Sequence, residues 1–238
     1  MKKLAFIIIC AGLLTMTAYP EVKLPKIFGS GMVLQQAMAI PVWGWASPGE
    51  RITVTLGKAS VRATAGRNGQ WRVQLPSLIA GGPFRMTVSG RNSINLENVM
   101  VGEVWICSGQ SNMEWPVASV NNGDEEIKNG VYPGIRLFTV PRRVAQHPLA
   151  DLESGEWLVC NPGTIAGFSA VGYFFGRELH LKQGVPVGLI QSAWGGTVAE
   201  TWISGETIAA EPDFSDALQK LRNMDLEKYG EEQKEKIR

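Results

Sequence analysis

The chain has 238 residues, of which 45% are hydrophobic and 19% charged, and its net charge at pH 7 is +1. This length is sufficient for one large domain or two small ones. The balanced charge gives no electrostatic basis for binding nucleic acid, so we expect no nucleic-acid partner. The 2 histidines and 3 cysteines do not show the spacing of a metal site, and the sequence predicts no cofactor.

The N-terminus has the pattern of an export signal. Two lysines precede an apolar segment, residues 4–14, which is too short to span a bilayer, and small residues follow it. We therefore predict a signal peptide over residues 1–18 and a soluble protein exported to the periplasm or the extracellular space. Lipidation at Cys10 is the less favoured alternative, because the apolar segment before this cysteine is very short.

Residues 19–98 are predicted to form a small all-β sandwich domain. Short, partly alternating apolar runs are separated by turn-forming residues. The expected strands cover residues 33–35, 40–45, 51–56, 59–63, 71–75 and 84–88. No acid–base cluster occurs in this region, so we favour a structural domain that packs against a catalytic one. A sugar-binding module is the alternative, because Trp43, Trp45 and Trp71 would stack on a sugar ring if they were exposed.

C-terminal to this region, the pattern changes to that of an α/β domain. An apolar run over residues 99–107 leads to a polar turn and then to an irregular stretch. Residues 168–183 have helical spacing, with Ser169 as the predicted N-cap and Gly184 as the predicted end. A second apolar run, residues 185–191, is typical of a buried parallel strand. Strand–helix–strand order places the polar turns that follow both strands at the same carboxyl edge of a sheet, where ligands bind.

Two serines follow the first apolar run. Ser108 ends the predicted strand, and Ser111 lies in the sequence Gly-Gln-Ser-Asn-Met. A serine that attacks an ester requires a base for its proton and donors for the oxyanion. A helix N-cap is the structural alternative for Ser111. The motif lacks the second glycine of the Gly-x-Ser-x-Gly elbow, which argues against an ordinary α/β-hydrolase.

The sequence around Ser111 resembles the nucleophile block of SGNH (GDSL-like) hydrolases, and most closely that of the sialate O-acetylesterase family. Further blocks in the same order are similar to this family, namely residues 32–35, 41–44, 47–50, 168–179 and 194–202. The resemblance implies an SGNH-type three-layer α/β hydrolase domain over residues 99–238. It also implies a carbohydrate O-acetylesterase that removes acetyl groups from sugar hydroxyls through a serine acyl-enzyme, with an acetylated sugar or glycan as its partner.

The resemblance also implies roles for individual residues. Ser111 is expected to be the nucleophile, and its own N–H, with that of Gly195 or Gly196, is expected to bind the oxyanion. The sequence leaves the choice between the two glycines open. The positions expected in the substrate pocket are Gln110, Asn112, Glu200 and Trp202.

The family's catalytic base lies in an Asp-x-x-His segment, which this sequence does not contain. His147 precedes a proline, but Val144 stands where the motif has its aspartate. His180 falls near the end of the predicted helix and suits its negative C-terminal pole. We therefore expect the chain to be an N-terminal fragment, incomplete at its C-terminus, with little or no esterase activity as it stands.

Several alternatives stay open. The sequence is also compatible with an acetylxylan-type esterase, or with a non-catalytic sugar-binding protein that carries a degenerate hydrolase domain. The identity of the sugar and the oligomeric state are not predicted. Cys107 and Cys160 are expected to be buried free thiols rather than a disulfide, because an unpaired cysteine behaves as a small hydrophobic residue.

Overall fold

The computed structural model describes residues 21–145, 147–225, 228–229 and 231. The predicted signal peptide, with Cys10, lies outside the described residues. Among the residues that are described, no helix is long and apolar enough to cross a membrane.

The N-terminal region is all-β, as predicted. Its strands are β1 (Val33–Gln35), β2 (Ile40–Trp45), β3 (Arg51–Leu56), β4 (Ala59–Thr64), β5 (Gln70–Leu75) and β6 (Gly81–Ser89). Strands β2 and β5 pair with each other in a separate two-stranded sheet, while the other four belong to a larger sheet. In β2, β3 and β5, alternation buries one side of the strand. In β3, for example, Ile52, Val54 and Leu56 are each at most 1% exposed.

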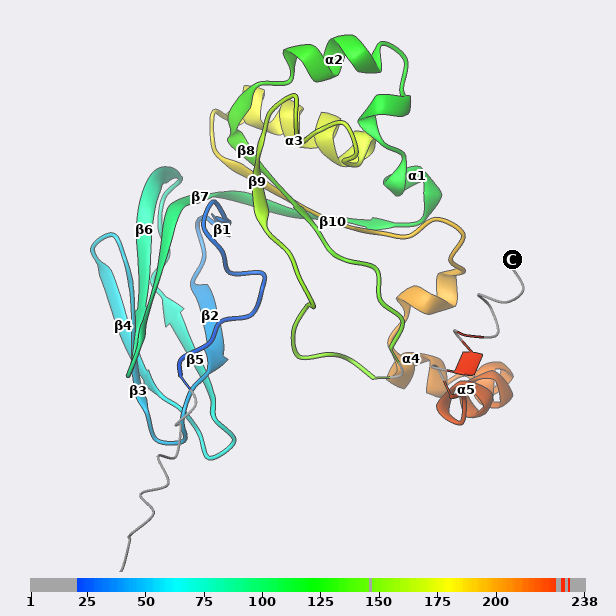
Figure 1. Ribbon diagram of the computed structural model, residues 1–238, viewed down its shortest axis with the longest axis horizontal. Helices are drawn as coiled ribbons and strands as arrows, with labels where there is room; N and C mark the ends of the chain where they lie inside the picture. Colours follow the sequence, from blue (N-terminus) through cyan, green and yellow to red (C-terminus); the bar gives the residue numbers. More distant parts are fainter. Residues whose placement is uncertain (1–20, 146, 226–227, 230, 232–238) are drawn as a thin grey trace, which may run out of the picture.

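One long strand, β7 (Ser93–Gly109), runs through both regions of the molecule. It has 17 residues. Its first part pairs with β6, its middle with β1, and its last part with β10 (Val187–Ala193). The two regions on either side of the predicted boundary at residue 98 therefore share a strand (Figure 1).

The C-terminal region is α/β, which confirms the predicted fold class. Strands β7, β10 and β8 (Tyr132–Thr139) are parallel, and β9 (Trp157–Cys160) is antiparallel at the edge. The predicted helix is α3 (Ala170–Gln183). Figure 1 shows α3 on the same face of this sheet as α1 (Ser111–Glu114) and α2 (Gly123–Asn129).

Both predicted ends of α3 are confirmed. The Ser169 side chain accepts a hydrogen bond from the Gly172 N–H, and Gly184 ends the helix in the left-handed conformation. The expectation of an irregular stretch before this helix was wrong, because α2, β8 and β9 lie within it. Proline, glycine and a buried arginine interrupt the apolar pattern of β8 and hide the strand.

Short elements connect and follow this sheet. Along the chain they are the 3₁₀ turns η1 (Val117–Ser119), η2 (Ala199–Trp202) and η3 (Pro212–Phe214), and the helices α4 (Gly205–Ala209) and α5 (Ser215–Arg222). Helices α4 and α5 contact each other and η3.

Two hydrophobic clusters form the core. The larger one fills the β region and reaches Phe138 of β8 and Trp157 of β9. The smaller one lies between the C-terminal sheet and α3 and contains Cys107 and Cys160. Both cysteines are free and buried, as predicted. Burial raises the pKa of each thiol to about 11, so both are protonated at neutral pH.

Candidate active site

The two polar turns of the α/β region lie side by side at the carboxyl edge of the sheet, as the sequence predicted. Ser111 is the first residue of α1, and only Gln110 separates it from the end of β7. The last residue of β7, Gly109, is in register with Ala193 at the end of β10. The Trp194 N–H then donates to the Gly109 carbonyl at 3.0 Å, which holds the second turn beside the first.

Gly195 lies beside the candidate nucleophile. A Cβ atom placed on Gly195 would lie 3.5 Å from Ser111 Cα and 3.6 Å from Ser111 Cβ. Gly196 has a φ of +81° with open space around it, a conformation that favours glycine. The Ser111 side chain is exposed, and its hydroxyl lies 3.5 Å from the Gln110 side-chain oxygen. The structure thus brings Ser111, Gln110 and the double-glycine turn together.

A carboxylate that the sequence reasoning missed joins the two turns. Glu114, the last residue of α1, accepts a hydrogen bond from the Gly195 N–H at 2.6 Å. It also forms an ion pair with Arg142, whose guanidinium lies 5.7 Å from the centre of the Trp194 ring. The only sequence signal for Glu114 is its position three residues after Ser111, which places both side chains on one turn of helix.

This hydrogen bond bears on the oxyanion hole. The Gly195 N–H is engaged by the Glu114 carboxylate, so it reaches a substrate oxygen only if that carboxylate moves away. An exposed Gly196 stands next to it in the turn. The choice between the two glycines as oxyanion donor, together with the role of the Ser111 N–H, stays a prediction.

Buried polar contacts support the site from behind. Gln191 of β10 is 6% exposed, and its side-chain oxygen accepts a hydrogen bond from the Ser169 N–H at 2.8 Å. The Ser169 hydroxyl, which caps α3, also lies 3.4 Å from the sulfur of Met113 in α1. These contacts connect β10, α3 and α1 and so fix the position of the Ser111 helix.

The other predicted substrate-pocket residues differ in how closely they are tied to this site. Trp202 donates from its indole N–H to the Thr197 hydroxyl at 2.9 Å, and that hydroxyl donates to the Trp194 carbonyl at 2.7 Å. Trp202 is therefore connected to the glycine turn. Asn112 is exposed beside Ser111. The half-buried Glu200 side chain makes no hydrogen bond or ion pair with any residue that the structure describes.

Neither histidine contacts Ser111 within the described part of the chain. His180 lies at the C-terminal end of α3, as expected, with Nδ1 2.7 Å from the Val185 carbonyl. The rise of an α-helix places it about 16 Å along the helix from Ser169, which is the end nearest the Ser111 helix. His147 is exposed in the loop between β8 and β9. The described residues also hold no group of three or more His, Cys, Asp or Glu side chains arranged for a metal ion.

Comparisons with known proteins point to one group of enzymes. A profile described as "Carbohydrate esterase, sialic acid-specific acetylesterase" matches residues 101–231. The chain is 34% identical over 199 residues to the sialate O-acetylesterase of Homo sapiens and 33% identical over 199 residues to that of Rattus norvegicus. These alignments cover 75% of this chain, but 38% of the human and 37% of the rat protein. The chain thus spans well under half the length of these curated relatives.

The fold is similar to that of a solved carbohydrate acetylesterase. The structure of XAC1771, described as a novel carbohydrate acetylesterase from Xanthomonas citri, superimposes with a TM-score of 0.77 and 38% sequence identity. The match covers 80% of this chain and 44% of that protein. At this identity, the similarity extends beyond general fold class.

Proposed function

Because the chain belongs to the sialic acid-specific acetylesterase family of carbohydrate esterases, we propose that it carries the nucleophile of a carbohydrate O-acetylesterase. The observation that carries this proposal is the placement of Ser111. Its side chain is exposed at the carboxyl edge of the sheet, and Gly195 lies so near that a Cβ atom placed on it would be within 3.6 Å of the Ser111 Cα and Cβ atoms. An accessible hydroxyl beside a glycine turn is the arrangement that acyl transfer requires.

The proposed reaction is acyl transfer in two steps. The Ser111 oxygen forms a bond to the acetyl carbonyl carbon, and the bond from that carbon to the sugar oxygen breaks, releasing the sugar hydroxyl. Water then attacks the acetyl-serine, which releases acetate and restores the serine. Backbone N–H groups of Ser111 and of Gly195 or Gly196 would hold the oxyanion in both steps.

The serine proton must pass to a base in the first step and to the leaving sugar oxygen as that bond breaks. The resemblance to the family assigns this base to an Asp-x-x-His segment that the present sequence does not contain. We accordingly propose that the 238-residue chain alone has little or no esterase activity.

For the substrate, we propose an acetyl ester on a sugar hydroxyl. The family profile and the mammalian relatives favour an acetylated sialic acid. The Xanthomonas citri protein is described only as a carbohydrate acetylesterase, and this wider description keeps an acetylated xylan as a second candidate.

The test uses the complete gene product that contains this sequence. Acetate release is measured with O-acetylated sialic acid and with acetylated xylan. We expect turnover of the sialic acid ester that the Ser111→Ala variant loses. Turnover of xylan alone would identify the second candidate, and turnover of neither ester would contradict the proposal.

We also propose that the protein is exported. The lysine pair and the short apolar segment at its N-terminus support this proposal. Cell fractionation followed by N-terminal sequencing provides the test. We expect mature protein outside the cytoplasm that begins near residue 19, and an intact N-terminus on cytoplasmic protein would contradict the proposal.

A further inference from the structure

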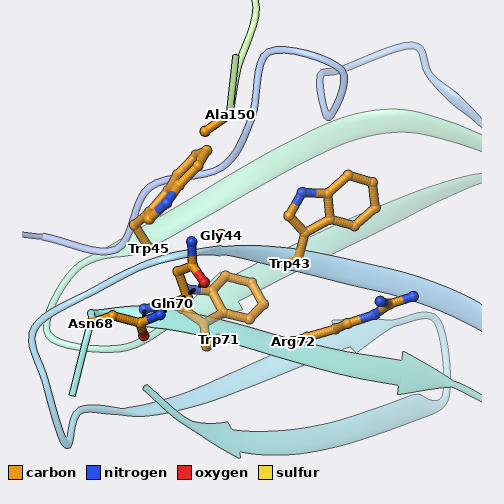
Figure 2. A pocket seen from close by; sticks show the side chains of 8 residues that line it. All are labelled: Trp43, Gly44, Trp45, Asn68, Gln70, Trp71, Arg72 and Ala150. Carbon is orange, nitrogen blue, oxygen red and sulfur yellow. Dashed lines mark hydrogen bonds between the residues drawn. The ribbon is translucent and has the colours of Figure 1, made fainter. Parts of the chain in front are cut away.

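A hollow lies on the N-terminal β region, and none of the candidate active-site residues lines it. Its cavity volume is about 600 Å³, which is within the range of small-molecule sites. Residues of β2 and β5, together with the turn before β5, form most of its wall, and Ala150 of the loop between β8 and β9 closes one side. We call it the β2–β5 pocket. Figure 2 shows the residues that line it.

Two indole rings project from the outward face of this two-stranded sheet. Trp43 and Trp45 alternate with buried residues along β2, so both point away from the core. Figure 2 shows them on the same side of the strand. Trp43 is 38% exposed, at a position where a solvent-facing strand usually carries a polar residue. Trp45 is half-buried. A pair of large aromatic side chains that reaches the surface next to a hollow is typical of a binding site.

The aromatic walls are held in place before any ligand binds. Trp43 packs edge-on against Phe28, with ring centres 4.7 Å apart and an angle of 75° between the ring planes. The Trp45 backbone forms two hydrogen bonds with Lys23. Strand geometry separates the two indoles by roughly 6.8 Å at their Cα atoms. Trp71 is 4% exposed and lines the pocket as a buried residue.

The polar groups of the pocket are hydrogen-bond donors. The register of the two-stranded sheet places Arg72 opposite Trp43 and Gln70 opposite Trp45. The Gln70 side-chain oxygen already accepts a hydrogen bond from Asn68 at 2.9 Å, which leaves the Gln70 amide N–H groups as donors. Arg72 has no ion pair or hydrogen bond with any described residue. No acidic side chain lines the pocket, so its charge is positive.

Another donor is buried without a partner. The indole nitrogen of Trp71 has no hydrogen-bond partner among the residues that the structure describes. Buried donors of this kind are uncommon, and an unfilled ligand or water position is one explanation for them. Aromatic faces, unpaired donors and one free guanidinium together match a flat, weakly polar ring that bears a carboxylate.

We propose that the β2–β5 pocket binds an acidic sugar, with the pyranose ring stacked on Trp43 and Trp45 and its carboxylate paired with Arg72. This inference requires no chemistry at Ser111. It assigns a binding role to a domain for which the sequence favoured a purely structural one.

Calorimetric titration of the 238-residue chain with N-acetylneuraminic acid tests the proposal. The methyl ester of this sugar keeps the ring but lacks the charge, and methyl glucoside represents a neutral ring. A Ser111→Ala background separates binding from any turnover. We expect saturable binding of the acid, and binding that is roughly 10-fold weaker or more for the ester, because a charge-assisted hydrogen bond is lost.

Variants locate the site. Arg72→Gln should weaken binding of the acid by about 10-fold or more while leaving the ester unchanged, and Arg72→Lys should restore part of the loss. Arg62→Gln, an exposed arginine on β4, is the matched control and should have no effect. Trp43→Ala should abolish binding, whereas Trp43→Phe keeps an aromatic face and should keep weaker binding.

Three results would overturn the proposal: no saturable binding of any sugar, equal affinity for the acid and its ester, or full affinity in the Arg72→Gln variant. Circular dichroism shows whether Trp43→Ala folds. If it does not, the Arg72 variants and Trp43→Phe decide the question. Acetate release and sugar binding are measured separately. Acetate release without sugar binding would overturn this proposal alone, and sugar binding without acetate release would overturn the proposed function alone.

Discussion

Glu114 is the side chain that fixes the distance between the nucleophile and the glycine turn. It shares a single short helix with Ser111 and binds the Gly195 N–H directly. Arg142 holds the carboxylate from the opposite side. A displacement of about 1 Å in a catalytic group is sufficient to reduce a rate by roughly 100-fold. The Glu114 contact is therefore expected to influence catalysis even though Glu114 is not assigned to the reacting atoms.

Replacing Glu114 with alanine should lower kcat of the complete gene product by up to about 100-fold, with a smaller change in KM. Glu114→Gln keeps an acceptor for the Gly195 N–H and should recover part of the activity. The control is Glu153→Gln, which breaks an exposed ion pair with Arg143 in the same loop and should leave kcat unchanged. An increase in kcat on loss of the carboxylate would show that Glu114 blocks the Gly195 amide rather than positioning it.

The contact between Glu114 and Arg142 illustrates what sequence patterns leave out. The two residues are far apart in the chain, and Arg142 lies in a loop whose hydrophobic residues show no periodicity from which its position could be predicted. The placement of Ser111 beside the glycine turn was predictable, because two apolar strands each end in a polar turn and parallel strands share a carboxyl edge. Which backbone N–H donates to the Glu114 carboxylate depends on the geometry of the loops, and composition and residue spacing do not reveal that geometry.

Among the elements, α2 and α3 are connected by a polar cluster. Glu126 of α2 accepts a hydrogen bond from the Tyr173 hydroxyl at 2.6 Å and forms an ion pair with Arg177 of α3. Burial alone would raise the pKa of Glu126, but the hydrogen bonds from Arg177 and Tyr173 outweigh burial and hold it below its ordinary value of 4.5. The charged carboxylate therefore stabilises the contact between the two helices.

This cluster predicts a pH dependence of stability. A carboxyl whose pKa is lower in the folded state contributes its full stabilisation above about pH 4.5 and loses it as the pH falls through the lowered pKa. Glu126→Gln should reduce the free energy of unfolding at pH 7 by about 1.5–3 kcal/mol, and this difference should shrink in acid. Glu125→Gln, an exposed neighbour on the same helix, is the control. Urea denaturation at several pH values measures both, and a pH-independent difference would contradict the assignment.

The junction of β7 and β10 depends on close backbone packing at Gly102. A Cβ atom on Gly102 would lie 2.0 Å from the Pro186 carbonyl oxygen, which belongs to backbone and does not move easily. Gly102→Ala should therefore destabilise the fold by about 1–3 kcal/mol, as overpacking usually does. Gly167→Ala, at a site with open space around it, should change stability by much less. Thermal unfolding of both variants provides the measurement. Equal melting temperatures would show that β7 and β10 move apart to accommodate the extra methyl group with little loss of stability.

The strands of the β region were more predictable than the long strand that follows them. Alternation fixed β2 and β3 to the residue, because one face of each is buried and the other is not. The continuity of β7 was not apparent. Asn98, which has a φ of +57°, interrupts the apolar pattern within it. Irregular pairing between β6 and β7 occurs in the same part of the sheet. Asn98, a turn-forming residue inside β7, was therefore interpreted as the boundary between the β region and the α/β region.

Considered as a whole, the molecule presents an open strand edge. In the described residues, the last part of β7, residues 103–109, pairs with β10 alone, because the pairing with β6 ends at Val101 and the pairing with β1 ends at Gly102. Nearby, Ile106 is 70% exposed and Trp105 is 42% exposed. An exposed apolar strand edge promotes pairing between chains.

We therefore expect the 238-residue chain to self-associate with increasing concentration. Ile106→Glu should reduce this association, because a charge on the edge strand opposes pairing. Ile79→Glu is the matched control, since Ile79 is 88% exposed and lies outside β7. Sedimentation velocity over a range of concentrations distinguishes the variants. A monomeric wild-type chain, or an equal effect of both substitutions, would show that this edge is not responsible.

The most direct test of the account is to trap the acyl-enzyme. The complete gene product is mixed with an acetyl ester, quenched in acid and digested, and the peptides are analysed by mass spectrometry. The account predicts one added acetyl group on Ser111, absent in the Ser111→Ala variant and retained in Ser108→Ala, because Ser108 lies within β7 and is not assigned to the reaction. An acetyl group on Ser108 or elsewhere, with turnover surviving Ser111→Ala, would contradict it.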